Sequence, residues 1–142
     1  MIYNADESPN PCNCNIPTTL PGPLFVGSGN VSHLGLSSAT VSSCVVLGPP
    51  SPFGGGAYIP QTIDVKSSCA TLVAANGDEL YLDPQPYTLI FDPNCLCHEG
   101  VSVVDVVGGT GRFANASGTL DVTISQDFSY VVTSNWSGTI SY

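Results

Sequence analysis

The chain is short of charged side chains, above all basic ones. Lys66 and Arg112 are its only lysine and arginine in 142 residues, against 11 acidic residues, and the formal net charge is −9. Proteins that bind nucleic acids need lysine or arginine to displace the counterions held on the phosphates. Binding to an anionic lipid surface makes the same demand. The composition therefore argues against nucleic acids and charged membrane surfaces as partners.

Long hydrophobic runs are also missing. No apolar segment approaches the roughly 18 residues that a membrane-spanning helix needs, so we expect no insertion into a membrane. The first seven residues lack the basic start and apolar centre of a signal peptide. We expect a soluble, exported chain in which any export signal has been removed or replaced.

The pattern of apolar residues favours strands over helices. No window shows the spacing of about 3.6 residues that is typical of an amphipathic helix. Residues 1–23 hold five of the 12 prolines, which predicts an extended arm. From residue 24 onward short apolar segments alternate with turn residues, and Asn76-Gly77 is a strong hairpin signal. The expected strands are 24–31, 37–47, 69–75, 78–82, 87–92, 101–107, 120–124, 128–133 and 138–142.

These segments predict one all-β domain over residues 24–142, preceded by the proline-rich arm 1–23. The architecture expected is a single antiparallel barrel or closed sandwich of about eight strands. The insert 48–60 has four prolines and four glycines, which predicts a long loop. Loops of this length often carry function or contacts.

Six cysteines, an even number, predict a disulfide framework of the kind that persists in oxidising compartments. They are Cys12, Cys14, Cys44, Cys69, Cys95 and Cys97. Structural zinc sites usually leave about two to four residues between paired cysteines, so a metal site built from the two Cys-x-Cys pairs and His98 fits poorly. Because residues two apart share a face of a strand, we expect the two Cys-x-Cys pairs to bond to each other. Cys44 would then bond to Cys69, one connectivity among the several that remain open.

Three asparagines head Asn-x-Ser sequons and are possible glycosylation sites. They are Asn30, Asn115 and Asn135. The two histidines, His33 and His98, stand in no recognisable catalytic context, and we expect both to be structural.

Two further motifs also favour a structural interpretation. The glycine-rich segment 108–114 would bind a dinucleotide only if a helix followed it, whereas a turn and a strand follow. We expect a tight turn there, with Phe113 in the core and Arg112 facing a carboxylate such as Asp105 or Asp121. The acidic residues of 76–83 lack the spacing of a calcium loop and predict a solvated hairpin tip. The sequence therefore assigns no catalytic, cofactor-binding or metal-binding residue.

Three stretches together resemble a known family. They are PheValGlySerGlyAsnValSerHisLeuGly at 25–35, AlaAlaAsnGlyAspGluLeu at 74–80 and GlyGlyThrGlyArgPheAlaAsnAlaSerGly at 108–118. In this order they resemble a group of mostly uncharacterised secreted bacterial proteins, which are similar to the allene oxide cyclase and dirigent type of calycin-like barrel. The resemblance implies an extracellular β-barrel over about residues 24–142, and no position matches the catalytic residues of the plant cyclases.

In such homologues a further strand precedes the first of these stretches, and here the proline-rich arm takes its place. We therefore expect a barrel with an open edge, which is a template for a strand of another chain. The function expected is a secreted, non-enzymatic structural subunit that forms a homo-oligomer or homopolymer, an extracellular polymer or surface layer, with its arm docked on a neighbour.

Two alternatives remain open. The barrel would bind a small apolar ligand, or have cyclase-like activity, if it holds a cavity of roughly several hundred cubic ångströms lined by residues such as Phe113, Tyr130 and Trp136, with a polar group at its base. It would be a carbohydrate-binding module if aromatic side chains, including Tyr81, Tyr87 and Trp136, form an exposed row.

Overall fold

The structure is a computed structural model that describes residues 1–6, 20–21, 24–32, 34–52 and 58–142. These residues form ten strands and one short 3-10 helix, and every strand pairing is antiparallel. The elements are β1 (Ile2–Asp6), β2 (Leu20–Pro21), β3 (Leu24–Val31), β4 (Gly35–Leu47), β5 (Thr62–Val73), β6 (Glu79–Pro84), β7 (Tyr87–Asp92), β8 (Cys97–Gly109), η1 (Gly111–Phe113), β9 (Ser117–Asp127) and β10 (Val131–Ser141). No helix among the described residues has the length and hydrophobicity to cross a membrane.

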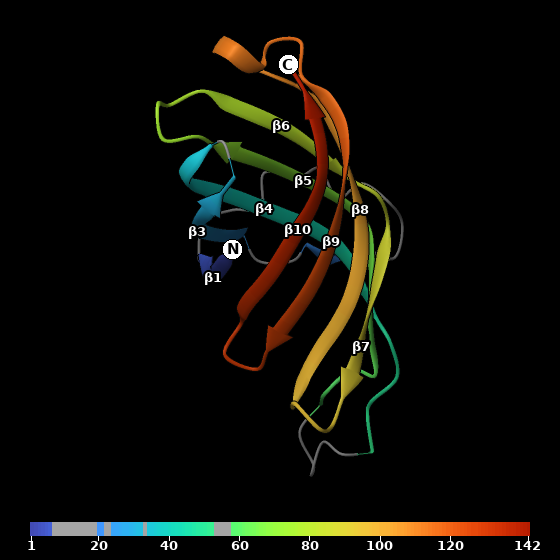
Figure 1. The fold of residues 1–142 in the computed structure, drawn as a ribbon. Helices are drawn as coiled ribbons and strands as arrows, with labels where there is room; N and C mark the ends of the chain where they lie inside the picture. Colours follow the sequence, from blue (N-terminus) through green and yellow to red (C-terminus); the bar gives the residue numbers. More distant parts are fainter. Residues whose placement is uncertain (7–19, 22–23, 33, 53–57) are drawn as a thin grey trace.

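Eight of the strands close into a barrel (Figure 1). β1 pairs with β3, the strands β3, β4, β5, β6, β8, β9 and β10 follow one another, and β10 pairs back with β1. β7 continues the line of β6, because it also lies between β5 and β8. β2 lies on β4 beyond the end of β3. The predicted all-β class and the barrel of about eight strands are confirmed.

The first strand corrects one expectation about this barrel. We expected an open edge because a proline-rich arm replaces a strand, but β1, inside the predicted arm, pairs with both β3 and β10. The first six residues contain no proline, so nothing prevents them from joining the ladder. The rest of the predicted arm, apart from Leu20–Pro21, lies outside the described residues.

The barrel interior differs between its two ends. At the end that carries η1, the upper end in Figure 1, buried side chains form one cluster around Phe113, whose exposed fraction is 0%. The predicted core position of Phe113 is confirmed, and we call this the capped end. The opposite end carries β7 and the β9–β10 turn (Figure 1). Its interior contains a cavity, and we call it the hollow end.

The β9–β10 turn lies later in the chain than predicted. Phe128 and Tyr130 were expected in a strand, but both lie in the turn, and Tyr130 has a positive φ of 58°. Asp127 holds this turn, since its Oδ1 accepts hydrogen bonds from the backbone N–H groups of Ser129 and Val131. A carboxylate that binds the backbone N–H groups of its own turn competes with the ladder bonds that would continue the strand.

Candidate functional site

The strand β1 closes the barrel along only part of β10. At the end of its ladder the amino group of Met1 donates to the carbonyl of Ser134 at 2.6 Å, and the Ser134 N–H donates to the Met1 carbonyl at 2.8 Å. Beyond this pair, residues 135–141 of β10 pair with β9 on one side, and no described strand lies on the other. We call residues 135–141 the free edge.

The alternation of an antiparallel ladder shows which backbone groups the free edge offers. Both the N–H and the C=O of Ser134 point toward β1, so those of Trp136, Gly138 and Ile140 point the same way. Within the described chain these three N–H and three C=O groups have no ladder partner. The free edge therefore presents a repeating set of donors and acceptors to another strand.

The free edge carries none of the usual protection against pairing. Native proteins guard exposed edges with charged side chains, especially lysine, or with proline. Residues 135–141 contain no charged residue and no proline. Such an edge is a strong predictor of contact with another chain.

A groove of about 750 Å³, lined by both polar and apolar side chains, lies beside the free edge. Its lining comes from β10 and from the end of β3, with Met1 at the border where β1 stops, and it includes interior side chains such as Leu72, Leu80 and Leu120. The groove thus leads from the unpaired backbone to buried side chains of the barrel interior.

Two of the three sequons lie at this groove. Asn30 on β3 and Asn135 on β10 are exposed and both line it. Asn115 is also exposed, between η1 and β9. All three side chains are accessible as a glycosylation site requires, and their modification stays a prediction.

The disulfide arrangement differs from the expected one. Cys95 and Cys97 bond to each other across the β7–β8 turn, so the expectation that the two Cys-x-Cys pairs cross-link is wrong. Leu96 between them has a positive φ of 52°, and this tight turn brings together two cysteines that a regular strand would place apart along one face.

The other described cysteines, Cys44 and Cys69, also form disulfide bonds. In the β4–β5 register Cys44 lies opposite Ser67, and Cys69 lies opposite Ser42. Cβ atoms of such diagonal neighbours are farther apart than a disulfide spans, so the expected Cys44–Cys69 bond does not fit this register. Cys12 and Cys14 lie outside the described residues.

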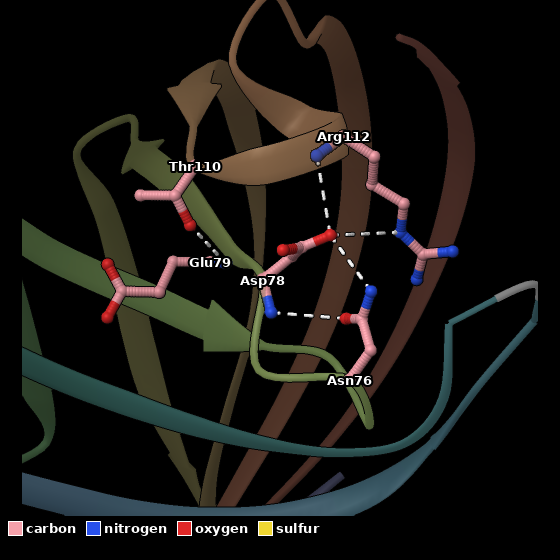
Figure 2. A network of polar contacts seen from close by, with 5 residues as sticks. All are labelled: Asn76, Asp78, Glu79, Thr110 and Arg112. Carbon is pink, nitrogen blue, oxygen red and sulfur yellow. Dashed lines mark hydrogen bonds and ion pairs between the residues drawn. The ribbon is translucent and has the colours of Figure 1, made fainter.

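The acidic turn and the glycine-rich turn hold each other at the capped end (Figure 2). Asp78 accepts hydrogen bonds from the Asn76 side chain at 2.9 Å and from the Arg112 backbone at 3.3 Å, and its Oδ2 lies 3.8 Å from Arg112 Nε. The Thr110 hydroxyl accepts from the Glu79 backbone at 2.9 Å. Arg112 therefore faces Asp78, and not Asp105 or Asp121 as expected, because the β5–β6 hairpin tip reaches η1.

These carboxylates have structural partners that a calcium site would have to displace. Glu79 also accepts a hydrogen bond from the Tyr81 hydroxyl at 3.1 Å. This bond, with smaller contributions from desolvation and the carboxylate charge, raises the pKa of Tyr81 above its usual value. Asn76 and Gly77 lie exposed in the hairpin tip as expected, whereas Glu79–Pro84 forms β6, in which Leu80 and Leu82 are buried.

His98 is buried in a structural role. Its Nε2 lies 2.7 Å from the carbonyl of Pro60, which ties the 48–60 loop to β8. Its ring also packs against Phe91, and Phe91 stacks on Phe128. His33 lies outside the described residues, as do residues 53–57 of the loop.

The hollow end contains an apolar cavity of about 170 Å³, which is smaller than the cavity expected of a ligand-binding barrel. Tyr130 and Trp136 line it as expected, whereas Phe113 does not, because it fills the capped end. Tyr87 also lines the cavity, while Tyr81 lies on the outer surface. These three aromatic side chains therefore do not form the exposed row that a carbohydrate-binding module would need.

No protein-family model, no curated protein and no solved structure matches this chain. The resemblance to the allene oxide cyclase and dirigent type of barrel stays a prediction.

Proposed function

We propose that the protein is a secreted structural subunit that self-assembles into an extracellular polymer or surface layer. In this assembly the free edge of one copy pairs with the free edge of another, and the N-terminal arm docks on a neighbouring copy. The observation that carries the proposal is the free edge itself: three N–H and three C=O groups, unguarded by charge, beside a groove of mixed polar and apolar lining.

Pairing between two copies of the free edge is physically favourable. In an antiparallel arrangement centred on Gly138, Trp136 of each copy lies opposite Ile140 of the other, which gives six backbone hydrogen bonds. Like charges across a strand pair are destabilising, and the free edge brings none together even though the chain carries a net charge of −9.

A lysine on the free edge tests this contact. Thr139→Lys places a charged, exposed side chain within the edge, and we expect self-association to weaken at least about tenfold, roughly 1.4 kcal/mol. The matched control is Thr123→Lys, which makes the same charge change at an exposed position of β9, inside the sheet. The measurement is small-angle scattering over a concentration series. Equal association of the two variants would contradict pairing through the free edge.

A second candidate function rests on the cavity of the hollow end. A cavity of about 150 Å³ lined by apolar side chains stays dry and accommodates a molecule of the size of benzene. No charged residue lines the cavity described here, and the side chain of Gln126, which does, has no hydrogen bond to a described residue. The ligand that fits is a small uncharged molecule with an apolar body and one polar group for Gln126.

Ligand binding is tested by the melting temperature with monocyclic hydrocarbons and alcohols. A ligand that binds only the folded barrel raises this temperature in proportion to its concentration. Ala70→Leu, which adds carbon atoms to the cavity wall, should reduce the rise. An unchanged melting temperature with every compound would remove this candidate.

A further inference from the structure

Pairing through the free edge cannot by itself build a polymer. Two copies that pair the same edge are related by a two-fold axis, and the contact closes at a dimer. An open-ended polymer needs a second contact that joins two different surfaces, one on each copy. The strand β1 and the slot that it fills between β3 and β10 are two such surfaces.

The contacts that hold β1 do not depend on which copy supplies it. β1 has five register pairs with β3 and three with β10, extended by the two backbone bonds between Met1 and Ser134. Backbone ladder bonds are the same between two copies as within one, so exchange of an identical strand costs little.

The connection after β1 is longer than closure within one barrel requires. Asp6 lies directly opposite Leu24 in the β1–β3 register, where a loop of about two residues joins the strands of a hairpin. In this chain residues 7–23 connect β1 to β3, and of these Leu20–Pro21 pair with β4. Residues 7–19 alone span at most about 45 Å when extended. This length allows β1 to reach a neighbouring barrel.

We infer that β1 of one copy occupies the slot between β3 and β10 of the next, in the register that it has in its own barrel. The inference rests on the proposed self-assembly and names the partner of the slot: a second copy of this chain. Each copy gives one strand and receives one, so the contact propagates head to tail. Paired free edges then join such polymers side by side.

The protein concentration decides whether β1 occupies the slot of its own barrel or the slot of another copy. A tethered strand has an effective concentration of about 1 mM for its own slot when the linker is short and flexible. Exchange between copies therefore becomes substantial near about 1 mM protein, or at lower concentration where paired free edges already hold two copies together.

A disulfide trap across the β1–β3 ladder tests the exchange in the full chain. Ile2 and Ser28 are exposed and directly opposite, and opposed residues of antiparallel strands lie within the reach of a disulfide. The double variant Ile2→Cys with Ser28→Cys is oxidised at about 10 µM and at about 2 mM, on either side of the effective concentration of a tethered strand. We expect a covalent monomer at the lower concentration and a ladder of covalent oligomers at the higher one on a non-reducing gel.

The matched control is Ser28→Cys with Ser38→Cys. These residues lie opposite each other on β3 and β4, which no exchange of β1 separates, so this variant should stay a covalent monomer at both concentrations. Scattering of the unoxidised protein distinguishes the failures. If scattering shows assemblies and the gel shows only internal cross-links, the exchange of β1 is wrong and the proposed self-assembly stands. If scattering shows monomers and the gel shows only internal cross-links, the exchange and the self-assembly are both wrong. An equal ladder in the control also overturns the exchange.

Discussion

Replacing Phe113 with alanine is expected to lower the free energy of unfolding by about 3–5 kcal/mol. Phe113 is completely buried and closes the capped end of the barrel. The Tyr142 ring packs edge-on against it, with centroids 5.2 Å apart, and the Arg112 guanidinium lies 4.7 Å from its centroid. Alanine would lose these contacts and leave a cavity that the surrounding strands cannot fill. Denaturant unfolding measures the loss.

Phe128→Ala is the matched control for this prediction. Phe128 lies in the β9–β10 turn, is 44% exposed and stacks on Phe91. Its truncation removes one aromatic contact, worth about 0.5–1.5 kcal/mol, and part of the apolar burial, so we expect a clearly smaller loss. Similar losses in the two variants would contradict the view that the capped end holds the core.

Loss of the Cys44 disulfide is the second change with a large expected effect. Cys44 is completely buried on β4 and disulfide-bonded. With Cys95 and Cys97 bonded to each other and Cys69 excluded by the β4–β5 register, any remaining partner closes a loop of roughly 31–33 residues, for which the loop-entropy relation gives about 3.7 kcal/mol. We expect Cys44→Ala to lower the free energy of unfolding by at least this amount under non-reducing conditions, since burial of the side chain adds to the loss.

The Cys95–Cys97 bond provides the comparison. It closes a loop of three residues, for which the same relation gives only about 1.6 kcal/mol. Replacing both cysteines with serine should therefore have less than half the effect of Cys44→Ala on unfolding. An equal or larger effect would mean that this short disulfide holds the hollow end together by contacts beyond loop closure.

The parts of the fold that depend on local pattern could be predicted from the sequence. Asn76-Gly77 lies in the expected turn between β5 and β6, and Gly77 has a φ of 90°, a backbone conformation that favours glycine. Buried residues alternate with exposed ones along β8, as the strand period requires. Phe113 is buried because it is the large apolar side chain of a glycine-rich turn.

The candidate site could not be predicted in the same way. β1 is five residues long, which is too short for its alternation to stand out beside a proline-rich segment. The free edge depends on the register of β1 against β10, in which Met1 pairs with Ser134, and this is a match between segments more than 100 residues apart. The Cys95–Cys97 bond likewise depends on a left-handed Leu96, a backbone state that few residues other than glycine and asparagine adopt.

The most direct test of self-assembly is the size of the wild-type protein in solution at about 1 mM, near the effective concentration of a tethered strand. Sedimentation velocity under non-reducing conditions, with negative-stain microscopy of the same sample, measures it. The proposed function predicts elongated assemblies much larger than the 14.7 kDa chain, lost on dilution and reduced by Thr139→Lys. A single species of 14.7 kDa at this concentration would contradict it.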